Sequence, residues 1–150
     1  MIRFSRMADY GVLLLGHFAR HADDLASTSE LAEACHMPRP VVANLLKEFC
    51  KAGLLESRRG QHGGYRLARP AEEISLLDIL SVIDGPVQLI DCAVLDLGAA
   101  GSCDYEDVCP SRSPMRAVHR RIIGVLQGVT LAELIAPQPA PPAAPVTASR

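Results

Sequence analysis

The 150-residue sequence lacks an apolar run long enough to cross a membrane. A membrane-spanning helix needs about 20 predominantly apolar residues, whereas the apolar stretch Gly11–Phe18 is short and contains His17. The first residues, MIRFSRMADYG, also lack the apolar region and cleavage site that are typical of a secretory signal. We therefore expect a cytoplasmic protein with no membrane partner.

Sequence motifs of enzymes are absent as well. The chain has no glycine-rich phosphate-binding loop between a strand and a helix, no nucleophile elbow and no paired catalytic carboxylates. We therefore do not expect an enzyme.

The number of cysteines is odd, five, which argues against a closed framework of disulfides. In a cytoplasmic protein thiols stay reduced, and grouped cysteines more often bind metal or sense redox state. Three of them share one segment: ten residues separate Cys92 from Cys103, and five separate Cys103 from Cys109. Cys35 and Cys50 stand beside core positions of helices, so we expect them to be small buried hydrophobes.

Charge is spread unevenly along the chain. The net charge is −2, but residues 1–70 contain ten Lys and Arg against seven Asp and Glu, a net +3. Residues 71–150 contain five against ten, a net −5. A basic N-terminal half fits a polyanionic partner, although an ordinary solvated surface explains it equally well.

Capping residues predict three helices in the first part of the chain. Ser5 can cap the first helix, and Ser27–Glu30 forms a capping box before a second helix over about 28–35. Pro40 suits the first position of a third helix, which Gly53 ends as a left-handed C-cap.

Two short strands, 54–57 and 65–68, follow the third helix and enclose a glycine-rich tip, which predicts a hairpin. A fourth helix is expected over Leu76–Asp84. This order of elements predicts a mainly α fold with a small β-hairpin, in which residues 1–85 form a winged helix-turn-helix DNA-binding domain.

The C-terminal part divides into three predicted regions. Residues 86–112 form a cysteine-rich loop, 113–135 a dimerisation helix with a short terminal helix, and 136–150 a disordered tail rich in Pro and Ala. The long helix has a short heptad pattern, which suits either a monomer's own core or a contact between two copies. Specific binding to a genome usually needs two half-sites, which favours a homodimer. The predicted dimer contacts are Met115, Val118, Ile122 and Val125.

The third helix and the wing offer suitable side chains for double-stranded operator DNA. Asparagine suits adenine edges, lysine suits phosphate or guanine, and a glycine-rich loop with two arginines can enter a minor groove. The predicted DNA contacts are Thr28, Arg39, Val41, Asn44, Lys47, Arg58, Arg59, Gln61 and His62.

Four stretches carry a family resemblance: RFSRMADYGVLLL, SELAEACHMPRPVVANLLKEFCKAGLLESRRGQHGGYRLAR, EEISLLDILSVIDGPV and the three-cysteine loop. Together they resemble the Rrf-type bacterial transcription regulators, the family that includes IscR and NsrR. The opening R-x-S-x-x-x-D-Y-G is most similar to the SUF-system branch of iron–sulfur assembly regulators. The resemblance implies a homodimer with a swapped or crossed C-terminal helix, and operator binding controlled by an iron–sulfur cluster near the dimer interface.

The sequence departs from the family's pattern in three places. Ala43-Asn44 replaces a base-reading Glu-Gln pair, so the operator sequence does not carry over. The three cysteines are spaced more widely than is usual, and Arg112 stands where IscR has a histidine.

Three thiolates favour an iron–sulfur cluster, zinc or copper(I), and leave one ligand position open. The candidates for that position are a small exogenous molecule or a side chain. The resemblance favours Asp9, because NsrR supplies an aspartate there from the opposite subunit, while the helix dipole alone also explains an acidic residue at this place. We expect His119 to be a surface residue. The candidate side chains are Asp9, Asp104, Asp107 and His119.

The function expected from these observations is a DNA-binding regulator of SUF-type genes that depends on an iron–sulfur cluster, of the 2Fe–2S or 4Fe–4S type, held by Cys92, Cys103, Cys109 and Asp9. A cluster-free thiol-based or nitric oxide-responsive repressor of the same family is the alternative. An iron–sulfur carrier or a zinc-stabilised interaction module would leave the wing and the helix-turn-helix unexplained.

Overall fold

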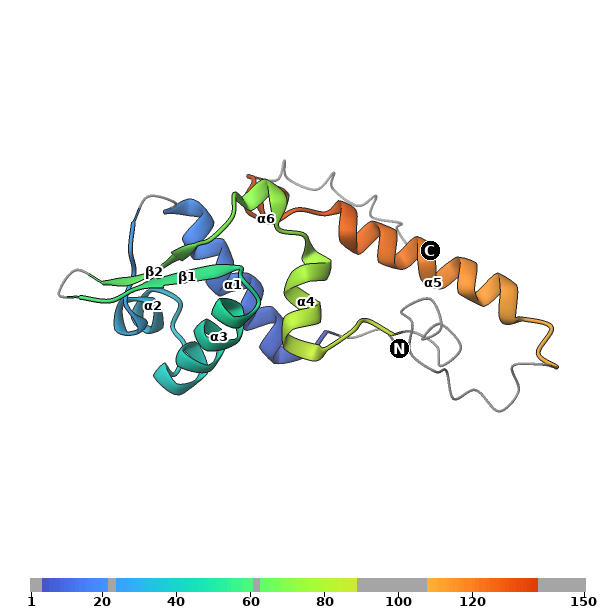
Figure 1. Cartoon of the computed structure of the whole chain (residues 1–150), viewed down its shortest axis with the longest axis horizontal. Coiled ribbons are helices and arrows are strands. Elements are labelled where there is room, and N and C mark those ends of the chain that lie inside the picture. The colour runs from blue at the N-terminus through green and yellow to red at the C-terminus, as the bar shows by residue number, and fades with distance from the viewer. Residues whose placement is uncertain (1–3, 22–23, 61–62, 89–107, 138–150) are drawn as a thin grey trace, which may run out of the picture.

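The computed structural model describes residues 4–21, 24–60, 63–88 and 108–137, and it is mainly helical with one two-stranded hairpin (Figure 1). Within the described residues, no helix combines the length and apolarity that a membrane crossing requires. The elements in chain order are α1 (Arg6–Arg20), α2 (Thr28–Ala34), α3 (Arg39–Lys51), β1 (Leu55–Arg58), β2 (Gly64–Leu67), the 3-10 turn η1 (Ala71–Glu73), α4 (Leu76–Asp84), α5 (Arg112–Gly128) and α6 (Leu131–Ile135).

Side-chain caps confirm the predicted starts of α1, α2 and α4. The Ser5 hydroxyl accepts the Ala8 N–H at 3.0 Å, and capping boxes begin α2, α4 and α6. Helix α3 begins at Arg39, one residue before the predicted Pro40. Gly53 follows α3 with a φ of +71°, a conformation that costs glycine little.

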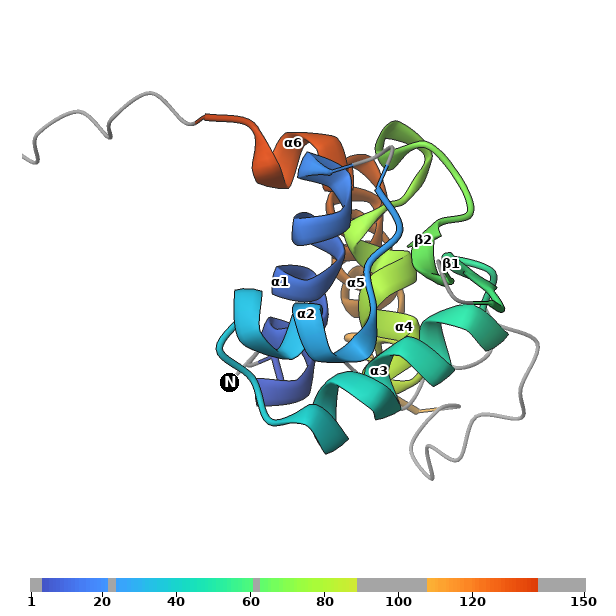
Figure 2. The same ribbon diagram turned by 90° about the vertical axis from the view of Figure 1, so that its left-hand side faces the viewer.

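The main core lies between α1, α2 and α3 and extends under the hairpin and α6. The largest side chains in it, Phe18 and Phe49, are at most 2% exposed. Helix α6 packs beside the C-terminal end of α1 (Figure 2). Leu131 at its start is fully buried, and its N–H donates to the carbonyl of Ile74 at 2.7 Å. The chain therefore returns to the N-terminal helices after α5.

The hairpin is attached to the segment before α2. Its strands pair antiparallel, each displaced by one residue from the prediction, and Tyr65 bridges Ala26 through two backbone hydrogen bonds of 2.9 and 3.1 Å. A Cβ at Gly64 would lie 2.9 Å from the Ala26 carbonyl oxygen, so only glycine allows this approach. These backbone bonds therefore fix the hairpin to the segment that precedes α2.

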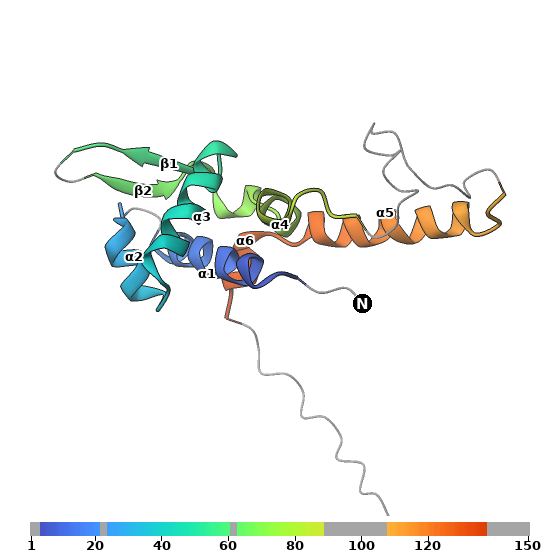
Figure 3. The ribbon, with the colours of Figure 1, turned by 90° about the horizontal axis from the view of Figure 1, so that it is seen from below.

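Helix α5 projects away from the other elements as an arm (Figures 1 and 3). Its C-terminal half packs on α4, where Leu126 meets Leu80 and Ala8 of α1 in a small second core. We call α5 the arm, and α1 to α4 with the hairpin, η1 and α6 the body.

Candidate nucleic-acid interface and cysteine segment

Helix α3 presents one apolar face to the core and one polar face to solvent. Val42, Leu45 and Phe49 are buried, and exposed residues between them form the polar face. On the polar face the Lys51 ammonium donates to a Glu48 carboxylate oxygen at 2.8 Å, and this bond lowers the pKa of Glu48. The exposed residues of this face include Pro40, Ala43, Asn44, Lys47 and Lys51.

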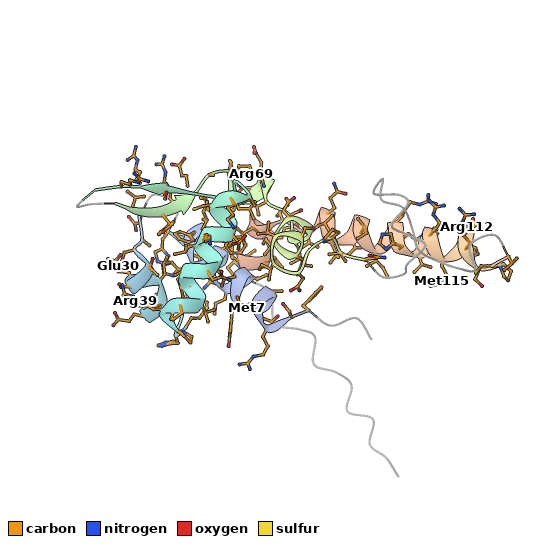
Figure 4. All side chains as sticks on the ribbon, turned by 60° about the horizontal axis from the view of Figure 1, so that its bottom comes forward. Met7, Glu30, Arg39, Arg69, Arg112 and Met115 are labelled. Carbon is orange, nitrogen blue, oxygen red and sulfur yellow. The ribbon has the colours of Figure 1, made fainter. Side chains whose placement is uncertain are left out.

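Three further predicted DNA contacts lie where α2 and α3 begin. Arg39, the first residue of α3, is exposed (Figure 4). Thr28, the first residue of α2, is half-buried. Val41 is also half-buried and packs against the main core, so much of its surface faces inward.

The wing presents Arg58 and Arg59 to solvent at the end of β1. Gly60 follows with a φ of +127°, a backbone conformation that residues with a side chain rarely adopt. At the base of the wing, Arg66 pairs with Glu56 directly across the two strands, a contact that the sequence reading missed. The remaining predicted wing contacts, Gln61 and His62, lie outside the described residues.

Of the cysteine segment, the structure describes Cys109. It is half-buried and immediately precedes the arm, where its carbonyl accepts the Arg112 N–H at 3.4 Å. Asp9 is exposed in the first turn of α1. Cys92 and Cys103 lie outside the described residues, and the described part of the chain has no group of three potential metal ligands. The proposed ligand set therefore stays a prediction.

The other two thiols behave as the sequence predicts. Cys35 is buried and Cys50 is half-buried against the main core. Burial raises the pKa of both thiols, which disfavours the thiolate that metals require.

His119 is not a surface residue, so that expectation was wrong. Its side chain is 4% exposed. It stands three and seven residues before Ile122 and Leu126, on the face of α5 that packs toward α4. This helical spacing was visible in the sequence, but the neighbouring Arg120 and Arg121 suggested a solvated position.

The predicted dimer contacts divide into two groups. Met115, Val118 and Val125 are 41%, 44% and 65% exposed, and Figure 4 labels Met115 on the arm. Ile122 instead packs against the core formed with Leu126. We call Met115, Val118 and Val125 the apolar seam, because all three are large apolar side chains of the arm that stay exposed in the described chain.

The helix-turn-helix, the basic wing and the protruding arm define a winged-helix DNA-binding transcription regulator. The model of the Rrf2 family, described as an iron-dependent transcriptional regulator, matches residues 4–137. The chain belongs to this family, and it is not an enzyme.

Three known proteins illustrate the relationship. A relative from Mycobacterium tuberculosis (strain H37Rv), named as an HTH-type transcriptional regulator, is 33% identical over 135 residues, which are 89% of this chain and 81% of the relative. The structure of T. potens IscR is 27% identical with a TM-score of 0.66, covering 89% of this chain and 86% of that one. The structure of CymR, the global cysteine regulator of B. subtilis, shares the fold at 22% identity and a TM-score of 0.70, covering 91% and 98%.

Proposed function

We propose that this regulator binds operator DNA as a homodimer and that an iron–sulfur cluster controls its affinity. Cys92, Cys103 and Cys109 would hold the cluster, with Asp9 as the fourth ligand. The proposed targets are SUF-type genes of iron–sulfur cluster assembly, on the resemblance of the first residues to that branch. The observation that carries the proposal is the position of Cys109, because a thiolate ligand there lies just before the N-terminus of the arm, the end of α5 that projects farthest from the body (Figure 1).

The donor set suits the cluster. Thiolates are soft ligands that favour iron–sulfur clusters, and a carboxylate in the fourth place is a more labile ligand. Burial favours the protonated thiols of Cys35 and Cys50, whereas Cys109 is not part of the main core. When bound, the cluster would supply iron that responds to redox state, and the family description as iron-dependent agrees with this.

A series of side-chain contacts connects the arm to α3, the helix that presents Asn44 and Lys47 to solvent. Leu126 of the arm packs on Leu80 of α4. A Cβ added at Gly11 of α1 would lie 2.2 Å from Ile83 Cδ1 of α4 and 3.0 Å from Phe49 Cζ of α3. The three helices therefore meet closely at this glycine, and a shift of α4 would be felt by α3. A coupling of 1–3 kcal/mol would change operator affinity about 5–150-fold.

The homodimer rests on the apolar seam. Val125 is 65% exposed, whereas Ile122 and Leu126 on the adjoining face of the same helix pack against α4. A seam of three apolar side chains on an arm is suited to pairing with the same seam of a second copy, which gives an isologous interface.

Anaerobic reconstitution tests the cluster. We expect Cys92→Ala, Cys103→Ala and Cys109→Ala each to abolish iron binding and visible absorption, and Asp9→Ala to weaken or destabilise the cluster. Cys50→Ala is the matched control, because it removes a thiol outside the segment. Wild-type iron content in the three loop variants would exclude the loop as the site.

Operator binding of the loaded and the cluster-free protein, measured on genomic fragments over a range of salt concentrations, tests the control of affinity. We expect a difference of at least fivefold between the two forms. Equal affinities would overturn the regulatory role of the cluster. Affinity that follows thiol oxidation in iron-free protein would favour the thiol-based alternative.

A further inference from the structure

A cavity lies between α4 and the arm, on the opposite side of α5 from the apolar seam. It has a volume of about 390 Å³. Leu77 of α4, Val87 of the following segment and Ile123 of the arm give it a largely apolar lining. Volumes of roughly 300–1,000 Å³ are typical of small-molecule sites. The cavity is therefore large enough for a small organic molecule.

Its polar lining residues are Ser81, His119, Arg120 and Gln127, of which His119 and Arg120 can carry a positive charge. The His119 side chain is 4% exposed, yet its Nδ1 has no hydrogen-bond partner among the described residues. A buried polar atom without a partner is unfavourable, and native structures usually satisfy it with water or a ligand. The exposed Arg120 borders the same cavity, so the cavity also has a cationic group in its lining.

We infer that this cavity binds a small organic carboxylate with an apolar body. A carboxylate oxygen can accept a hydrogen bond from the Nδ1–H of His119, and the Arg120 guanidinium can donate to the same group. Leu77, Val87 and Ile123 would cover the apolar body. An uncharged apolar molecule would leave the His119 nitrogen unsatisfied, which selects the acid.

The position of the cavity gives the ligand a regulatory effect. It lies between the arm and α4, and α4 also packs against α1 and α3. A bound ligand would stabilise one arrangement of the arm against the body, and operator affinity would change. This consequence rests on the proposed function, whereas the binding itself does not.

Two glycines of the arm allow a matched test. A Cβ at either Gly124 or Gly128 would meet nothing within 4 Å, but Gly124 borders the cavity and Gly128 does not. Gly124→Leu should therefore fill the cavity without a clash, and Gly128→Leu is its control. His119→Phe keeps an aromatic ring and removes the nitrogen atoms.

The probe is sodium octanoate, titrated into the full chain by calorimetry, with 1-octanol as the uncharged analogue. We expect octanoate to bind the wild type and Gly128→Leu with a Kd below about 1 mM. Gly124→Leu should weaken both probes at least tenfold. His119→Phe should weaken octanoate about tenfold and change octanol less than about twofold, as expected for the loss of a charge-assisted hydrogen bond.

No octanoate binding to the wild type, or equal binding to Gly124→Leu, would overturn the inference. Dissociation of a dimer by Gly124→Leu but not by Gly128→Leu, seen in sedimentation, would overturn it too, because the cavity would then be a contact between copies. The titration contains no DNA and needs no cluster. Its failure would leave the proposed function standing, and failure of the cluster experiments would leave the titration valid.

Discussion

The body and the arm are both built from amphipathic helices, but they differ in what covers their apolar faces. In the body, Phe18 and Phe49 are at most 2% exposed, and each helix finds its partner within the chain. On the arm, Val118 and Val125 are 44% and 65% exposed. The apolar faces of the body are therefore covered within the chain, whereas the seam of the arm is free for the second copy that the proposed homodimer would supply.

The charge of the arm also differs from the net charge of the half of the sequence in which it lies. Residues 71–150 have a net charge of −5, yet the arm contains Arg112, Arg116, Arg120 and Arg121 and no acidic residue. The acidic excess belongs to the other segments of that half. Arginines four residues apart repel one another slightly on a helix, so the arm also favours anionic neighbours.

The largest expected effect comes from truncating a buried side chain of the body to alanine. An exposed side chain of the arm, truncated in the same way, is the comparison. Phe49→Ala should lower the free energy of unfolding by about 3–5 kcal/mol, because it leaves a cavity in a fully packed core. Met115→Ala, at a residue that is 41% exposed, should cost less than about 1 kcal/mol in dilute protein. Urea denaturation measures both, and similar losses would contradict the division into body and arm.

The second prediction concerns the seam alone. Val125→Asp should weaken the dimer by about 3 kcal/mol or more, at least 100-fold in Kd, because it would bury an uncompensated charge. Gln127→Asp places the same charge two residues away on another, exposed face of the arm and should leave the dimer within about threefold. Sedimentation equilibrium gives both constants, and circular dichroism checks that the body stays folded. A normal dimer in Val125→Asp would remove the seam from the interface.

The sequence predicted the body well because its signals are local. Ser5, Ser27 and Ser75 mark helix starts through hydrogen bonds within one turn, and α4 has the predicted bounds. The strands and α3 are displaced by one residue, which local signals do not resolve.

Tertiary packing decided what the sequence reading missed. His119 resembled a surface residue because charged neighbours outweighed its spacing to Leu126, and the cavity beside it depends on how α4 and α5 cross. The Ala26–Tyr65 bridge likewise joins residues far apart in the chain. Of the candidate sites, the exposed Asn44 and Arg59 were predictable, since helical periodicity and the hairpin alone place them outward.

The third prediction concerns the DNA surface of the body. Arg59→Ala should weaken operator binding by about 1–3 kcal/mol and reduce the salt dependence by about one ion, since Arg59 is exposed at the wing. Arg121→Ala, which removes an exposed arginine from the arm, should change operator affinity less than about twofold. Fluorescence anisotropy at several salt concentrations measures both. Equal effects of the two substitutions would mean that general charge, and not the wing, binds the DNA.

The smallest expected effect is a dependence of the body's stability on pH. Partial burial first, and then the charges of His21 and Arg20, lower the pKa of His17 below its ordinary value of 6.5. The unfolded chain therefore binds a proton more readily than the folded one, and stability falls as pH drops through about 6.5 toward the lower folded pKa. The His17 ring also stacks on His21 at 4.5 Å between centroids. His17→Gln should reduce the loss of Tm between about pH 7.5 and pH 5.5. His36→Asn is the control and should not reduce this loss. His36 lies at an exposed turn with a φ of +51°, which asparagine tolerates. An unchanged pH dependence in His17→Gln would place the acid sensitivity outside the body's first helix.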